Sequence, residues 1–96
     1  MPPLLTPDET TAALAELPGW TVDGPSLVRT TELASFPEAI AAVARVADVA
    51  EAMDHHPDVD IRWRTLTFRC ATHSEGGITA LDVRLAAEIS ALLAAG

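Results

Sequence analysis

Hydrophobic side chains recur every three to four residues in three segments of this chain, which predicts three amphipathic helices. The longest is expected over residues 36–54. A shorter helix should begin at Pro7 and end at Pro18-Gly19, because that pair cannot continue the hydrogen-bond ladder. A third should follow Thr79. The apolar positions of these helices are, in chain order, Ala13, Leu14 and Leu17; Phe36, Ile40, Val43, Ala47 and Ala50, widened by Val46, Val49 and Met53; and Leu81, Leu85, Ile89 and Leu92.

Each predicted helix begins at residues that can satisfy the free backbone N–H groups of a first turn. Thr6-Pro7-Asp8-Glu9 and Ser35-Phe36-Pro37-Glu38 have the S/T-x-x-E form of a capping box. Thr79 can cap the third helix, and Asp82 places an acidic side chain in its first turn, near the positive end of the helix dipole. These signals fix where the three helices should start.

The period changes to two in the segments between the helices, as in strands with one buried face. Residues 20–22 and 27–33 flank Asp23-Gly24-Pro25-Ser26, whose turn residues predict a first hairpin. A second hairpin should begin beyond Pro57 and turn near Arg64 and Thr65. Its apolar positions are Val59, Ile61 and Trp63 on the first strand and Leu66, Phe68 and Cys70 on the second. Trp63 is in phase with its neighbours, so we expect a core aromatic.

The resulting order is helix, hairpin, helix, hairpin, helix. Two hairpins with one apolar face predict an α+β fold, a four-stranded antiparallel sheet made of two hairpins with three helices packed on one face. Ninety-six residues suit one domain, which we expect to span residues 1–96.

The charge balance argues against two classes of partner. Fourteen acidic and six basic residues give a formal net charge of −8. The averaged electrostatic field of this negative charge repels phosphate backbones and anionic membrane surfaces. With no bilayer-length apolar run and no signal-peptide pattern, we expect a cytoplasmic protein. The single cysteine, Cys70, lies in a strand-like stretch, where a buried structural thiol is the usual finding.

The segment Asp54-His55-His56-Pro57, at the end of the long helix, allows three interpretations. Histidine is favourable near the negative end of a helix and proline is common just past it, so the segment can simply be a helix terminus. A metal site would need His73 as a third ligand, but no HExxH, CxxC or clustered acidic pattern accompanies it. The third interpretation is acid–base chemistry, because imidazole both donates and accepts protons near neutral pH.

Topology should bring these histidines together. His55 and His56 enter the first strand of the second hairpin, and His73 follows its second strand. In an antiparallel hairpin the beginning of one strand lies beside the end of the other, and His56 and His73 each lie about eight residues from the turn. We therefore expect them at the same edge of the sheet. The loop of residues 74–77 then brings Asp82 towards that edge.

Two carboxylates accompany the histidines, each with two interpretations. Glu51 lies four residues before His55, so on a helix the two side chains share a face and the carboxylate can hold the imidazole; otherwise Glu51 is a solvated helix residue. Asp82 can orient a histidine or cap its own helix, and both can hold at once.

With these residues named, the sequence resembles the pterin-4a-carbinolamine dehydratase family, also called 4a-hydroxytetrahydrobiopterin dehydratases. The family pattern is an acidic or basic residue, three residues, His-His-Pro, five or six residues, an aromatic, nine residues, His, at least eight residues and Asp. The corresponding residues here are Glu51, His55-His56-Pro57, Trp63, His73 and Asp82. The chain departs from many members at Val59, where a large aromatic is common, and has Trp63 where Tyr is frequent.

The resemblance implies a dehydratase that converts 4a-hydroxytetrahydropterin to quinonoid dihydropterin and water, in pterin recycling for aromatic amino-acid hydroxylases, without a metal or redox cofactor. His55 and His73 would be the principal acid–base pair, with His56 assisting and holding the pterin. Asp54 and Ala71-Thr72-His73-Ser74 would contact the pterin ring. Glu51 and Asp82 would set the orientation and charge of the histidines, and Trp63 would lie in the same outer layer. A homodimer or homotetramer is implied as well.

Two other functions stay open. Animal members of the family also serve as dimerisation cofactors of a homeodomain transcription factor, so this fold can act as a non-catalytic interaction module. A pterin-binding protein of molybdopterin or folate metabolism is the third possibility. An interaction module should tolerate loss of His55 and His73, whereas a dehydratase should not.

Overall fold

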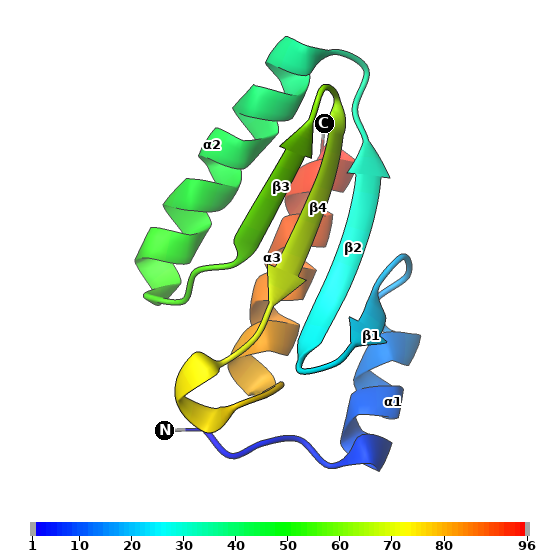
Figure 1. Cartoon of the computed structure of the whole chain (residues 1–96), viewed down its shortest axis with the longest axis vertical. Helices are drawn as coiled ribbons and strands as arrows, with labels where there is room; N and C mark the ends of the chain where they lie inside the picture. The colour runs from blue at the N-terminus through cyan, green and yellow to red at the C-terminus, as the bar shows by residue number, and fades with distance from the viewer. Residues whose placement is uncertain (1, 96) are drawn as a thin grey trace.

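The chain folds into one four-stranded antiparallel sheet with three helices, as the computed structural model shows for residues 2–95 (Figure 1). The sheet order is β1-β2-β4-β3, so β1 and β3 are the edge strands. The elements are α1 (Pro7–Ala15), β1 (Thr21–Asp23), β2 (Ser26–Glu32), α2 (Phe36–Met53), β3 (Asp58–Arg62), β4 (Thr65–Cys70), a 3₁₀ turn η1 (His73–Glu75) and α3 (Ala80–Ala95). The predicted α+β fold and element order are confirmed.

The core lies between the sheet and the helices. Helix α3 crosses behind the sheet and packs against β2, β4 and α2, while α2 runs alongside β3 (Figure 1). Because the central strands β2 and β4 are covered by α3, their inward apolar side chains are fully buried. The fully buried apolar side chains include Leu27, Leu66, Phe68, Leu85 and Ile89.

The capping box at Thr6 forms as predicted, whereas at Ser35 only the half made by the serine side chain forms. Thr6 and Glu9 make the reciprocal hydrogen bonds of a capping box, and the Ser35 hydroxyl accepts the backbone N–H of Glu38. Helix α1 ends at Ala15, a few residues before the proline that was expected to stop it. Among residues 2–95 no helix is both long and apolar enough to cross a membrane.

The prediction of a core aromatic at Trp63 is wrong. Its side chain is 70% exposed at the tip of the second hairpin, where Trp63 and Arg64 form a two-residue turn and Trp63 adopts a φ of 54°. Ile61 is also 42% exposed. The alternation correctly identified the apolar face of β3, but β3 is an edge strand and the helices do not cover its far end.

Candidate functional site

Helix α2 ends just before the histidine pair. Asp54 adopts the left-handed conformation, with φ 50° and ψ 42°, which a short polar side chain tolerates. The N–H groups of Asp54 and His55 donate to the carbonyls of Glu51 (3.2 Å) and Ala50 (3.0 Å), the hydrogen-bond pattern of a Schellman motif. The helix-terminus interpretation is therefore confirmed, and this turn sets the directions of the next two side chains.

His55 points inward and meets a buried carboxylate. Its Nε2 lies 2.6 Å from Oδ1 of Asp82, in the first turn of α3. His55 is 9% exposed and Asp82 is fully buried. The contact joins the end of α2 to the start of α3 across 27 residues of sequence.

The second oxygen of Asp82 is held by the chain around it. Oδ2 accepts the Thr79 backbone N–H and the Thr72 hydroxyl, both at 2.8 Å. Because the Thr72 proton is used on Asp82, the Thr79 hydroxyl donates to the Thr72 oxygen at 2.7 Å. Asp82 thus acts both as a helix cap and as the partner of a histidine, as the sequence allowed.

This arrangement selects one tautomer of His55. An ionised carboxylate only accepts hydrogen bonds, so Nε2 carries the proton that faces Asp82. Nδ1 of the neutral ring is then left with its lone pair and can take up a proton. A ring whose orientation and tautomer are fixed in this way suits proton transfer at Nδ1.

Glu51 contacts a different histidine from the one expected. Its Oε2 hydrogen-bonds Nε2 of His56, not His55. The reason is the left-handed turn at Asp54, which takes His55 off the helical face and returns His56 over the last turn of α2. This pair is open to water, with side chains 54% and 77% exposed, so it contributes little to stability.

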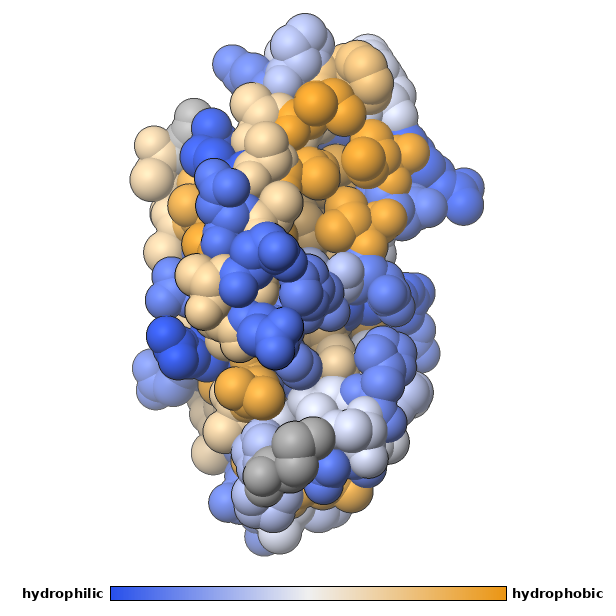
Figure 2. All heavy atoms as spheres, turned by 90° about the vertical axis from the view of Figure 1, so that its left-hand side faces the viewer, coloured by the Kyte–Doolittle hydropathy of each residue, from blue (hydrophilic) through white to orange (hydrophobic). Residues whose placement is uncertain are grey.

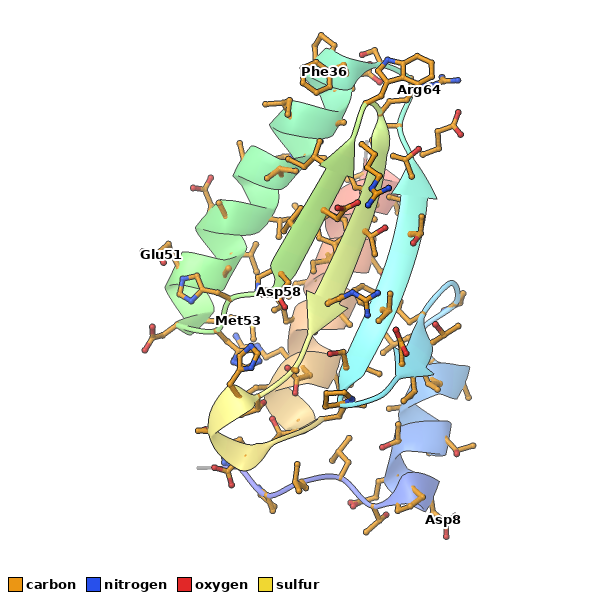
Figure 3. All side chains as sticks on the ribbon, viewed as in Figure 1. Asp8, Phe36, Glu51, Met53, Asp58 and Arg64 are labelled. Carbon is orange, nitrogen blue, oxygen red and sulfur yellow. The ribbon has the colours of Figure 1, made fainter. Side chains whose placement is uncertain are left out.

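His73 lies at the same end of the sheet. Asp58 of β3 pairs with Arg69 of β4, and continuing that register places the residues before β3 beside those after β4. His73 follows Thr72, the residue that holds Asp82, and its side chain is exposed at the start of η1. The two histidine-bearing segments therefore leave the hairpin at the same end of the sheet, and a direct approach of His73 to His55 or His56 stays a prediction. Figure 3 shows this end of the molecule, where Glu51 and Met53 mark the end of α2 and Asp58 the start of β3.

The other expected site residues divide by position. The end of the sheet that carries His55, His56 and His73 is called the histidine end below. There Ala71 is half-buried, and Asp54 and Ser74 are exposed. Trp63 lies at the opposite end of the hairpin, where its ring is 4.7 Å from the Arg64 guanidinium carbon, so the structure does not bring it to the histidines.

Cys70 is close to the site without suiting its chemistry. The thiol is fully buried, as predicted, and burial raises its pKa to about 12, with the charges of Asp82 and Asp58 adding to the effect. A thiol with such a pKa stays protonated and unreactive near neutral pH.

The holding role of Thr72 and Thr79 was missed from the sequence. Thr79 was expected only as a cap and Thr72 only as a pterin contact, yet both fix Asp82. The available signal was the T-x-x-D pattern of the cap, read together with a threonine at the end of β4. Among residues 2–95 no three His, Cys, Asp or Glu side chains are grouped to hold a metal ion.

Comparison with known proteins agrees with this geometry. The family model described as pterin 4 alpha carbinolamine dehydratase matches residues 3–92. A relative from Mycobacteroides abscessus, named "Putative pterin-4-alpha-carbinolamine dehydratase", is 58% identical over 90% of this chain and 92% of its own length. A Nocardia farcinica relative of the same name is 52% identical, over 93% and 94%.

A solved structure has the same fold. The crystal structure of a transcriptional coactivator/pterin dehydratase from Brucella melitensis superposes with a TM-score of 0.89 at 36% identity, covering 93% of this chain and 97% of that one. The histidine end of the sheet, the matching family model and these relatives together show that the chain belongs to the pterin 4 alpha carbinolamine dehydratase family.

Proposed function

We propose that this protein is a hydro-lyase that dehydrates a 4a-hydroxytetrahydropterin to quinonoid dihydropterin and water, in the recycling of pterin for aromatic amino-acid hydroxylases. The family supports a dehydratase acting on a pterin. The observation that carries the proposal is the buried His55–Asp82 pair. A helix cap needs only one carboxylate oxygen, and Asp82 commits the other to an imidazole.

The reaction needs two proton transfers. The N5 lone pair expels the C4a hydroxyl, which leaves as water after receiving a proton from an acid, and a base then removes the proton from N5. His55, fixed by Asp82, and His73, exposed on the facing segment, are the proposed acid–base pair. His56 would hold the pterin and assist. Each transfer contributes about 10²- to 10⁴-fold, enough for a reaction that also proceeds unaided.

The test is stopped-flow absorbance of 4a-hydroxytetrahydropterin decay, against the uncatalysed rate. His55→Gln and His73→Gln should each lower turnover by about 10²-fold or more, with thermal unfolding showing that each variant is folded. Arg84→Gln, an exposed change on α3, is the control and should retain full activity. Decay no faster than the uncatalysed rate with folded wild type, or near-normal turnover in both histidine variants, would contradict the proposal.

We also propose that the protein forms a homodimer or homotetramer through the open side of β3. An apolar surface made by Phe36, Ile40, Ile61 and Trp63, all more than 40% exposed, lies over the start of α2 and the end of β3. Figure 2, which faces α2, shows apolar side chains gathered in the upper half of this side. Such a surface beside an unpaired strand edge is typical of an interface.

The sequence of β3 is complementary to itself. Arg62 and Thr65 flank the two-residue turn and close the hairpin, so the alternating ladder directs the backbone groups of Val59 and Ile61 outward. A two-fold axis at Asp60 would pair Val59 with Ile61 of the second copy and Asp58 with Arg62. The two copies of Asp60 would face each other across the axis. Their like charges are offset because each Asp60 carboxylate accepts a hydrogen bond from Arg62 of its own chain at 3.1 Å. The second copy is therefore the partner that this edge fits.

Light scattering tests the assembly. Wild type should form a dimer or tetramer at micromolar concentration, and Ile61→Lys should shift it towards monomer, whereas Arg84→Gln should not. A strict wild-type monomer, or an unchanged assembly in Ile61→Lys, would remove this interface.

A further inference from the structure

A cleft that no histidine lines lies between the segment just after α1, strand β2 and the second half of α3. Its volume is about 460 Å³, within the range of small-molecule sites. Most of the wall is apolar, and it includes Leu17 just after α1, Leu33 just after β2 and Leu93 of α3. One cation, Arg29, enters this wall from an inward-facing position of β2, where an apolar residue would be usual.

Arg29 is held in place without a carboxylate partner among residues 2–95. Its Nη1 donates to Ser90 Oγ at 3.0 Å, and Trp20 Nε1 donates to the same oxygen at 2.8 Å. The stem lies over Gly19, where a Cβ would come within 3.3 Å of Nε. Gly19 also has a φ of 89°, so both its conformation and its lack of a side chain accommodate the arginine.

The other arginines do not share this situation. Arg62, Arg64 and Arg69 each pair with a carboxylate, and Arg45 and Arg84 are exposed to water. Within residues 2–95, Arg29 is the half-buried arginine with no carboxylate within 4.0 Å. A guanidinium has five N–H donors in a fork that matches a carboxylate, and only one of those of Arg29 has an acceptor in the part of the chain that the structure describes.

The charges at the rim narrow the class of ligand. Glu32 also lines the cleft, but its Oε1 is 2.8 Å from Arg64 Nη2, which neutralises it. Glu16 also lines the cleft, is exposed and has no cation within 4.0 Å among the described residues. One fixed cation and one available carboxylate beside an apolar wall match a small zwitterion.

We propose that this cleft binds a free α-amino acid with an apolar side chain. Arg29 receives its carboxylate in a bidentate pair, Glu16 attracts its ammonium group, and the side chain lies against Leu17, Leu33 and Leu93. This site is separate from the histidine end of the sheet, and the proposal stands whether or not the protein is a dehydratase.

The experiment is an amide NMR titration with L-leucine up to about 10 mM, a range that detects millimolar affinity. The matched probes are 4-methylpentanoate, which lacks the ammonium group, and 3-methylbutylamine, which lacks the carboxylate. We expect leucine to shift the amides of Leu33, Ser90 and Leu93 and both analogues to bind at least about tenfold more weakly, since each forgoes one charged contact.

Variants locate the binding. Arg29→Gln should weaken leucine binding at least about tenfold, whereas Arg84→Gln should leave it unchanged. Ala87→Leu fills the cleft from an exposed helical position without touching the charges, so it should abolish binding even if Arg29→Gln folds poorly. Absence of localised shifts with leucine, equal binding of 4-methylpentanoate, or full binding in the folded Ala87→Leu variant would each overturn the proposal.

Discussion

Replacing Asp82 by Asn isolates what the buried carboxylate does for His55. Asn has nearly the same shape, but one oxygen becomes an NH₂ group. The Thr79 N–H cannot rotate away, so the remaining oxygen must stay on that side, where it also accepts the Thr72 hydroxyl. The NH₂ group then faces Nε2 of His55, which has to become an acceptor. The ring proton moves to Nδ1, the atom proposed to exchange protons with substrate.

The expected magnitude follows from this geometry. The helix cap survives, but His55 accepts only one N–H of the buried NH₂ group, so the loss of unfolding free energy should be about 1–3 kcal/mol, the cost of the weakened hydrogen bonds and of the second, unpaired N–H. Turnover should fall by about 10²- to 10⁴-fold, because the ring presents the wrong tautomer. Asp82→Ala should instead lower stability by about 3–5 kcal/mol, because the His55 Nε2–H, the Thr72 hydroxyl and the Thr79 N–H all lose their buried acceptor, at about 1–3 kcal/mol each.

The assay combines stopped-flow decay of 4a-hydroxytetrahydropterin with ¹⁵N NMR of the imidazole rings. Wild type should show His55 protonated at Nε2, and Asp82→Asn should show it protonated at Nδ1. Glu51→Gln is the matched control, since it makes the same chemical change in the exposed pair with His56 and should change turnover by less than about tenfold. Turnover within a few-fold of wild type in Asp82→Asn, or a large loss with the Nε2 tautomer retained, would refute the reasoning.

Two further perturbations test the surroundings of Asp82. Thr72→Val keeps the side-chain shape but removes the hydroxyl that donates to Asp82, so denaturant unfolding should show a loss of about 1–3 kcal/mol with reduced turnover, and Thr72→Ser should restore both. Cys70 remains protonated in the folded state up to its pKa of about 12 but ionises near 9.0 when unfolded, so stability should be lost as pH rises above 9, by up to about 1.4 kcal/mol per pH unit. Urea unfolding between pH 8 and about 11 should show this slope in wild type and not in Cys70→Ala. The chain has no Tyr and no Lys to add a slope of their own in that range, so equal slopes in the two proteins would contradict the raised pKa.

The position of the histidine end was predictable because it depends on register. Antiparallel pairing of β3 with β4 fixes which residues lie beside one another beyond the strand ends. The alternating pattern of apolar residues predicts that pairing from the sequence alone. The caps at Thr6, Ser35 and Thr79 were equally local, since each satisfies N–H groups within the next three residues.

Side-chain partners at the end of α2 were less accessible from the sequence. The i to i+4 rule that linked Glu51 with His55 holds only while the helix continues, and the left-handed residue at Asp54 ends it. The prediction that Trp63 is a core aromatic was wrong for a different reason. An alternating pattern identifies the apolar face of a strand, but it does not say whether the strand is central or at an edge, nor how far the helices extend over it.

The two adjacent histidines therefore have different surroundings, and this implies different kinetic roles. After the left-handed residue at Asp54 the two side chains meet different partners, His55 the buried Asp82 and His56 the exposed Glu51. A fixed, nearly buried ring suits proton transfer, whereas an exposed ring can move to hold a ligand. We expect His55→Gln to lower kcat with little change in KM, and His56→Gln mainly to raise KM. Steady-state kinetics of the two variants measures this split. Equal losses of kcat in the two variants would mean that the buried contact of His55 with Asp82 does not give the two histidines different kinetic roles.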